Sequence, residues 1–197
     1  MKKAELKAAT VAILKDEKIP FEKREEMAAE YLVEQLFAKV KDKAGEPYIG
    51  HLRRVADGVR QRLKAAALMH DVLEDIKGWT AQDLLDIGFS AYTVRCVEAV
   101  TKQPGEKYFD AMVRVGRTLP AIFIKRSDLR DNSNLLRLPR LPLKKDFNRV
   151  TKYSLADKYL RDIENLIILQ GTPFEDWMKA QPKELQDFAL LKKHTAL

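Results

Sequence analysis

Apolar and polar residues follow one another along the chain with the period of an α-helix rather than that of a β-strand. Ala, Leu, Glu, Lys, Gln and Arg dominate, whereas β-branched runs that alternate with polar residues are scarce. In the segment 146–169, one helical face carries Leu155, Tyr159, Ile163 and Ile167. This spacing is typical of a helix that packs on a hydrophobic core. We therefore expect an all-α fold, built as a compact helical bundle.

Turn-forming and capping residues divide this pattern into separate helices. Pro20 separates the first two helices, and Gly-Glu-Pro at 45–47 forms a turn ahead of the third. Thr80 with Asp83 has the pattern of a helix N-terminus, and Ser90 is placed to cap the next helix. The expected helices are 4–16, 22–41, 48–58, 60–76, 81–87, 91–102, 107–117, 121–134, 146–169, 173–180 and 182–193.

The length of 197 residues fits one ordinary domain, or one domain with extra terminal helices. We expect a central domain at 25–165, an N-terminal helical segment at 1–24 and a C-terminal helical extension at 166–197. The sequence leaves the role of this extension open.

Composition excludes several classes of protein. Hydrophobic residues make up 46% of the chain, too many for a disordered protein. There is no run of about 18 apolar residues that would cross a membrane, and the basic start lacks the apolar core of a signal peptide. The single cysteine, Cys96, cannot form an internal disulfide, so a reducing cytoplasm is the expected compartment.

The net charge of +7 indicates an anionic partner. Nucleic acid, an acidic membrane surface and a phosphorylated small molecule all carry negative charge. The basic residues are scattered without a run of five, and no cluster interleaves them with aromatic residues. This argues against nucleic acid, and we expect no membrane partner. A phosphorylated small molecule or an ordinary solvated surface remains.

The central candidate for chemistry is His70-Asp71, which interrupts the apolar segment 65–75. Charged groups are costly to bury unless they are paired or bind a metal. On a continuous helix, Glu74 lies one turn after both His70 and Asp71, so the three side chains share one face. Asp75 likewise lies one turn after Asp71. We expect these polar groups to line a pocket, and the alternative is a polar patch on a helix surface.

A metal site needs further ligands from other helices. His51 lies on the preceding helix, and Asp128 lies at the end of an apolar segment downstream. With His70 and Asp71 they give two imidazoles and two carboxylates, a set that suits Mn²⁺, Fe²⁺ or Zn²⁺ and leaves positions open for water. For His51 taken alone, a buried structural histidine is the alternative. His194, near the C-terminus, is expected to be exposed.

Five stretches of the chain form an ordered set of motifs: GEPYIGH at 45–51, AAALMHDVLED at 65–75, VTK at 100–102, GEKY at 105–108 and IKRSDLRDN at 124–132. Taken in this order, they resemble the HD-domain metal phosphohydrolases. Within that superfamily the sequence is similar to the hydrolase domain of RelA/SpoT-type alarmone enzymes and to the stand-alone small alarmone hydrolases. The resemblance covers residues 25–160.

The resemblance implies an HD-domain bundle with Mn²⁺-dependent removal of the 3′-pyrophosphate from guanosine tetra- or pentaphosphate. The family's metal ligands match His51, His70, Asp71 and Asp128, its catalytic acidic pair matches Glu74 and Asp75, and its asparagine after the last ligand matches Asn132. Glu74 would position or deprotonate the attacking water. Asp75 would support it or cap polar groups of the pocket. Asn132 would orient the substrate or a ligand, or end its helix.

Polyphosphate binding requires cations in fixed positions. The candidates are Lys39, Lys41, Lys102, Lys107, Arg130, Arg149 and Lys152. The resemblance favours Lys41, and for the others a solvated surface role is the alternative. Tyr48 and Tyr153 would stack on a nucleobase or pack in the core. The expected partner is a phosphorylated guanosine nucleotide, and the oligomeric state stays open.

Two further functions are compatible with the sequence. One is the same metal chemistry on another phosphorylated nucleotide, such as NADPH or a deoxynucleotide. The other is a non-catalytic, HD-like binding module for RNA or a protein partner, against which the presence of all ligand types argues.

Overall fold

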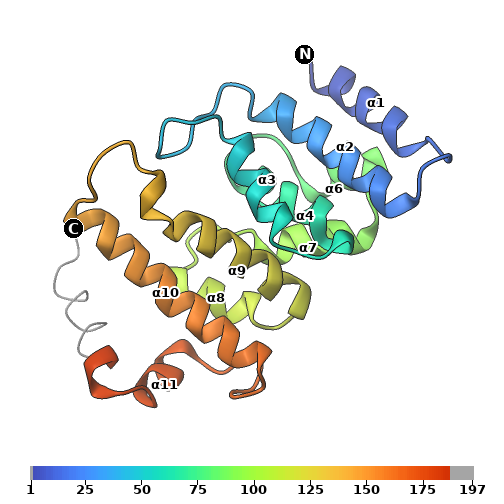
Figure 1. The fold of residues 1–197 in the computed structure, drawn as a ribbon. Helices are drawn as coiled ribbons and strands as arrows, with labels where there is room; N and C mark the ends of the chain where they lie inside the picture. The colour runs from blue at the N-terminus through green and yellow to red at the C-terminus, as the bar shows by residue number, and fades with distance from the viewer. Residues whose placement is uncertain (1, 187–197) are drawn as a thin grey trace.

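The computed structural model describes residues 2–186, and the prediction of an all-α fold is confirmed (Figure 1). The helices are α1 (Lys3–Leu14), α2 (Phe21–Leu36), α3 (Ile49–Asp57), α4 (Lys64–Leu68), α5 (Val72–Asp75), α6 (Ala81–Ile87), α7 (Ala91–Val100), α8 (Tyr108–Val115), α9 (Leu119–Ser133), α10 (Lys144–Glu164) and α11 (Phe174–Lys179), with the 3₁₀ helices η1 (Gln61–Leu63) and η2 (Leu135–Arg137). Within the described residues no strand forms, and one isolated antiparallel bridge joins Lys41 to Pro47.

The expected capping residues occupy the helix starts that the sequence indicates. Thr80 Oγ1 accepts a hydrogen bond from the Asp83 amide at 3.2 Å, and the Asp83 carboxylate accepts one from the Thr80 amide at 2.9 Å. This reciprocal pair begins α6. Ser90 Oγ accepts from the Thr93 amide at 3.2 Å and begins α7. Pro20 directly precedes α2.

The single helix expected at 60–76 is wrong, because the backbone breaks at residues 69–71. The segment forms η1 and α4, then a turn that carries His70 and Asp71, and then α5. His70 Nδ1 lies 2.8 Å from the carbonyl oxygen of Ala67, the acceptor that the Asp71 amide would use in a continuous helix. The turn therefore places His70 and Asp71 between two short helices rather than on one long face.

Two expected helices are shorter than their apolar pattern suggests. α2 ends at Leu36, because the chain turns back on itself and the Tyr48 amide donates to the carbonyl oxygen of Val40 at 3.0 Å. α10 ends at Glu164, because Leu166 adopts a left-handed backbone with φ of 59°. Ile167 therefore lies beyond the helix with 67% of its surface exposed, and its expected place in the core is wrong.

The helices surround one hydrophobic core, and their order in space roughly follows their order along the chain (Figure 1). In Figure 1, α3, α4, α7 and α9 form the middle, with α1 and α2 at one end and α10 and α11 at the other. α10 packs along α9, and α1 packs on α2 and α6. The middle group matters most, because α3, the α4–α5 turn and α9 carry the four expected metal ligands.

The described part of the C-terminal extension folds back onto the bundle. α11 packs against α8, and Trp177 is buried, its Nε1 donating to Asp162 at 2.9 Å. Most of the helix expected at 182–193, and His194, lie outside the described residues. Among the helices of residues 2–186, none has the length and apolar character needed to cross a membrane.

Candidate metal centre

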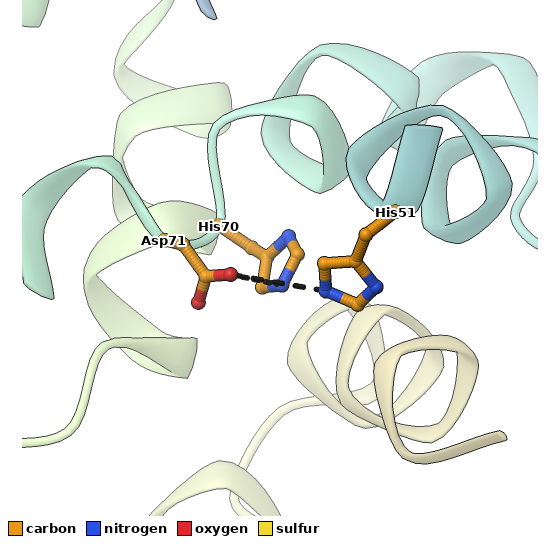
Figure 2. Close-up of side chains that lie close together, drawn as sticks. All are labelled: His51, His70 and Asp71. Atoms are coloured by element: carbon orange, nitrogen blue, oxygen red, sulfur yellow. Dashed lines mark ion pairs between the residues drawn. The ribbon is translucent and has the colours of Figure 1, made fainter. Parts of the chain in front are cut away.

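His51, His70 and Asp71 come together although they lie far apart in the sequence (Figure 2). His51 projects from α3, and the other two project from the α4–α5 turn. His70 Nε2 lies 3.0 Å from Asp71 Oδ2, and His51 Nε2 lies 3.8 Å from the same oxygen. Ligand atoms from all three residues lie within 4.8 Å of one another, so this group could hold a metal ion.

Asp128 approaches the same group from α9. Its Oδ1 lies 3.4 Å from His51 Nε2 and 3.7 Å from His70 Nε2. Asn132, one turn later on α9, donates from Nδ2 to this oxygen at 2.5 Å, and Lys125 Nζ lies 2.7 Å from the other oxygen. The fourth expected ligand thus faces both imidazoles, with its carboxylate held from two sides.

The two imidazoles present their Nε2 atoms as a metal ligand requires. His51 Nδ1 bonds to Asp131 Oδ2 at 2.7 Å, and His70 Nδ1 bonds to the carbonyl oxygen of Ala67. Both Nε2 atoms are buried without a hydrogen-bond partner among the described residues. Histidines that bind metals characteristically hold the second ring nitrogen in this way. The donor set therefore fits a divalent cation, which would accept the lone pairs of both Nε2 atoms.

Without a bound metal, burial and the neighbouring charges shift the pKa values of the candidate ligands. Burial opposes the charged form of His70, but Asp71 and Asp128 outweigh it and raise the His70 pKa to about 10. Burial would raise the pKa of Asp128, but Lys125 and the two imidazoles hold it well below its ordinary range. A bound cation would replace the imidazole protons, so affinity for a metal is expected to rise with pH.

Glu74 and Asp75, the expected acidic pair, both lie on α5. Glu74 is exposed, and its carboxylate accepts from the Lys102 amide at 3.1 Å beside a cavity of about 480 Å³. Asp75 is exposed as well, and partial burial, followed by the Asp71 and Glu74 charges, raises its pKa despite the opposing imidazoles. The shared helical face expected for His70, Asp71 and Glu74 is lost with the break at 69–71.

A second, smaller hollow of about 90 Å³ is lined by residues that hydrogen-bond to two of the candidate ligands. Its lining includes Tyr48, whose hydroxyl donates to Asp71 Oδ2 at 2.5 Å, and Asn132, which holds Asp128. Lys43, Arg137 and Arg149 contribute three positive charges to the lining, against two negative charges from Asp42 and Asp131. Burial and the neighbouring Arg149 lower the pKa of Lys43, while Asp128 and Asp71 oppose this shift. We call this hollow the basic pocket.

The structure distributes the expected substrate contacts unevenly. Lys102 lines the larger cavity. Tyr153 is half-buried, with its ring centroid 6.3 Å from that of Tyr108, and burial followed by the Asp128 charge raises its pKa. Lys152 is half-buried, with Nζ 4.4 Å from the centroid of the Tyr108 ring, and it lines neither cavity. The other candidates are exposed and line neither of the two cavities: Lys39, Lys41, Lys107 and Arg130.

Several residues of the site were missed from the sequence. Asp131 and Lys125 each lie three residues from Asp128 on α9, so helical spacing alone could have placed them on its face. Burial opposes ionisation of Asp131, but His51, Arg54 and Arg137 lower its pKa to about 2. Lys43 gives no such signal, because its position depends on how the α2–α3 connection folds.

No protein-family model matches the chain, and no curated protein matches its sequence. The resemblance to HD-domain phosphohydrolases therefore stays a prediction that rests on the motifs. What the fold adds is the spatial convergence of the residues in those motifs.

Proposed function

We propose that the chain is a metal-dependent phosphohydrolase. One observation carries this proposal: the two buried Nε2 atoms of His51 and His70 have no hydrogen-bond partner and face the carboxylates of Asp71 and Asp128. A site of mixed nitrogen and oxygen ligands suits Mn²⁺, and Fe²⁺ or Zn²⁺ are the alternatives.

Within this class, we propose that the reaction is removal of the 3′-pyrophosphate from guanosine tetra- or pentaphosphate. The order of the motifs along the chain supports this choice. The basic pocket supports it as well, because Lys43 and Arg149 place positive charge beside the ligands, where phosphates of a substrate would lie.

The residues of the site have complementary tasks in this reaction. A divalent ion held by His51, His70, Asp71 and Asp128 would lower the pKa of a water and polarise a phosphoryl oxygen. Lys43 and Arg149 bind the phosphates, and Tyr48 fixes Asp71 through its hydroxyl.

Glu74 and Asp75 handle the attacking water. The amide of Lys102 fixes the Glu74 carboxylate at the edge of the larger cavity, from which Glu74 positions the water. Asp75 supports proton transfer, because its raised pKa makes it a better proton acceptor than an ordinary carboxylate.

A second candidate is the same hydrolysis on another phosphorylated nucleotide, such as NADPH or a deoxynucleotide. It is favoured by the position of Lys39 and Lys41, which are exposed and line neither cavity. The resemblance favoured Lys41 for phosphate binding, so its position outside both cavities removes one feature that would tie the site to the guanosine-specific family.

Hydrolysis of a nucleotide panel tests the proposal. The full chain with Mn²⁺ is offered guanosine tetraphosphate, guanosine pentaphosphate, NADPH and a deoxynucleoside triphosphate, and pyrophosphate and orthophosphate are measured separately. We expect pyrophosphate from the two guanosine compounds. Orthophosphate from NADPH, or turnover of the deoxynucleotide alone, would favour the second candidate. No turnover of any compound would indicate a non-catalytic binding module.

A further inference from the structure

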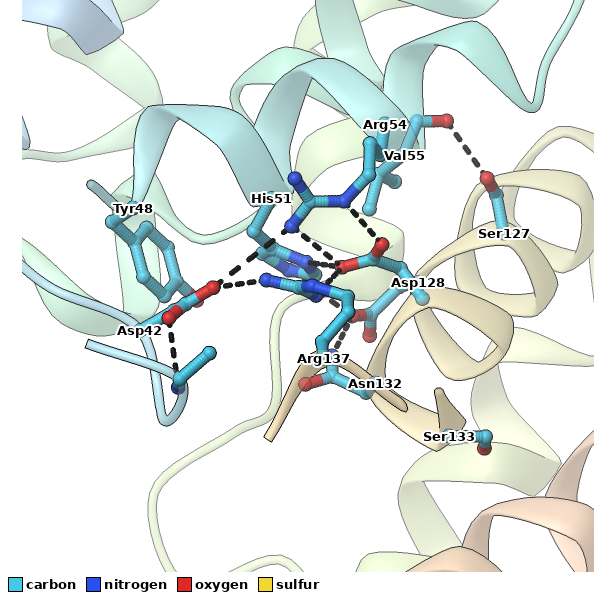
Figure 3. A network of polar contacts seen from close by, with 12 residues as sticks. Asp42, Tyr48, His51, Arg54, Val55, Ser127, Asp128, Asn132, Ser133 and Arg137 are labelled. Atoms are coloured by element: carbon cyan, nitrogen blue, oxygen red, sulfur yellow. Dashed lines mark hydrogen bonds and ion pairs between the residues drawn. The ribbon is translucent and has the colours of Figure 1, made fainter. Parts of the chain in front are cut away.

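A chain of ion pairs runs from His51 to the connection between α2 and α3 (Figure 3). His51 Nδ1 donates to Asp131 Oδ2 at 2.7 Å, and Arg137 Nη1 donates to the same oxygen at 2.6 Å. The other arm of the guanidinium, Nη2, donates to Asp42. One arginine thus joins the carboxylate that holds a candidate ligand to a carboxylate in a distant loop.

Asp42 in turn organises the loop in which it lies. Its Oδ1 accepts hydrogen bonds from the amides of Ala44 at 2.8 Å and Glu46 at 3.1 Å. These bonds shape the turn at 42–46, which carries Lys43 at the basic pocket. One oxygen of the Asp42 carboxylate therefore accepts hydrogen bonds from the turn, and the other accepts one from Arg137.

The burial of these groups makes the connection specific. The side chains of Asp42 and Asp131 are only 9% and 8% exposed, and that of Arg137 is 22% exposed. Buried carboxylates require fixed partners, and the planar fork of a guanidinium can serve two of them at once. Arg54 also bonds to Asp131, at 2.6 Å, but its side chain is 42% exposed and it lies 3.9 Å from Asp42.

We propose that Arg137 is a positioning residue that couples the metal centre to the basic pocket. Through Asp131 it fixes the ring orientation and tautomer of His51, so that Nε2 stays directed at the cation. Through Asp42 it holds the turn that carries Lys43. The assignment of the basic pocket to phosphate rests on the proposed function, whereas the two structural couplings do not.

Metal titration of the full chain tests the first coupling. Calorimetry with Mn²⁺ compares the natural protein with Arg137→Met and Asp131→Asn, and Arg117→Met serves as a matched control because Arg117 is an exposed arginine outside the network. We expect each of the first two variants to raise the Mn²⁺ dissociation constant by roughly tenfold or more. The control should bind as the natural protein does.

Amide hydrogen exchange tests the second coupling. Asp42→Asn keeps the oxygen that accepts from Ala44 and Glu46 but weakens the pairing with Arg137. We expect this variant and Arg137→Met to accelerate exchange of those two amides, by roughly tenfold. Asp131→Asn should leave them unchanged.

Double variants decide whether Arg137 acts through its two carboxylates. Adding Arg137→Met to Asp131→Asn should weaken Mn²⁺ binding no further, and adding it to Asp42→Asn should accelerate exchange no further. Additive effects in both cases would overturn the proposal, as would natural metal affinity in Arg137→Met. Arg137→Lys, which keeps the charge without the fork, provides a second variant if Arg137→Met does not fold, and it should show both losses in part. A protein that binds Mn²⁺ but hydrolyses no nucleotide would overturn the proposed function and leave these couplings intact.

Discussion

At the scale of single residues, the candidate metal centre depends on which ring nitrogen of each histidine is already engaged. Nδ1 of His51 and Nδ1 of His70 are held by Asp131 and by the Ala67 carbonyl, which leaves both Nε2 atoms for a cation. Asp71 then contributes the carboxylate nearest to His70. Loss of that carboxylate should therefore reduce the amount of bound metal.

Asp71→Ala is expected to abolish both bound metal and turnover. The variant removes one of the carboxylates beside the two imidazoles, and few-ligand sites retain divalent ions poorly. Metal content after dialysis, measured by atomic spectrometry, checks this outcome. Asp57→Ala is the matched control, because the Asp57 side chain is 76% exposed. Full metal content in Asp71→Ala would remove this residue from the ligand set.

Glu74→Gln is expected to keep the metal and lose roughly 100-fold in kcat, since the amide retains the shape of the side chain but cannot act on water as a carboxylate does. Steady-state kinetics alongside metal analysis checks this. Asp75→Asn provides the comparison: the raised pKa of Asp75 means that its carboxylate loses its proton at higher pH than usual. If the proposed hydrolysis takes place, the rate of the natural protein should rise as pH rises through that pKa, and this acidic limb of the pH profile should vanish in Asp75→Asn. An unchanged rate in Glu74→Gln would contradict its assigned role.

At the scale of helices, the sequence predicts starts better than interiors. Thr80 and Ser90 cap their helices as expected, because a cap depends on residues within one turn. The break at 69–71 was not predicted, because periodicity cannot detect that the His70 side chain takes the carbonyl of Ala67. The candidate ligands themselves were read from motifs, whereas Lys43 and the two cavities arise only when distant segments pack.

α1 is joined to α6 by ion pairs that should respond to pH. Lys3 and Lys7 each place Nζ 2.7 Å from an oxygen of Asp83. Burial opposes ionisation of Asp83, but these lysines and Thr80 outweigh it and lower the Asp83 pKa. A carboxylate whose pKa is lower in the folded state stabilises the protein above its unfolded pKa, and loses this contribution as pH falls through the folded value.

Asp83→Asn should therefore lower the free energy of unfolding at neutral pH by about 1 kcal/mol, the scale of partly exposed ion pairs. The difference from the natural protein should shrink below about pH 4, where unfolded Asp is protonated. Urea denaturation at several pH values checks both statements. A difference that stays constant down to pH 2 would show that Asp83 acts through packing rather than charge.

At the scale of the whole molecule, the candidate metal centre lies where α3, the α4–α5 turn and α9 already pack together around the hydrophobic core. α3, the α4–α5 turn and α9 each carry candidate ligands, and these elements lie in the middle of the bundle (Figure 1). The buried carboxylates and imidazoles there are held by protons and by Lys125 when no cation is bound. A cation should therefore stabilise the native arrangement and have no comparable site in the unfolded chain.

Removal of metal should lower the thermal midpoint of unfolding. A ligand present at about 100 times its dissociation constant stabilises the native state by about 2.7 kcal/mol. For a chain of this size, that corresponds to a shift of roughly 5–10 °C. Calorimetric scans in Mn²⁺ and in excess chelator measure the shift. Asp71→Ala should show no shift, because the variant is expected to fold but to lack one of the metal ligands. An equal shift in Asp71→Ala would show that the stabilising cation binds elsewhere on the protein. The metal site would then not be the one formed by His51, His70, Asp71 and Asp128.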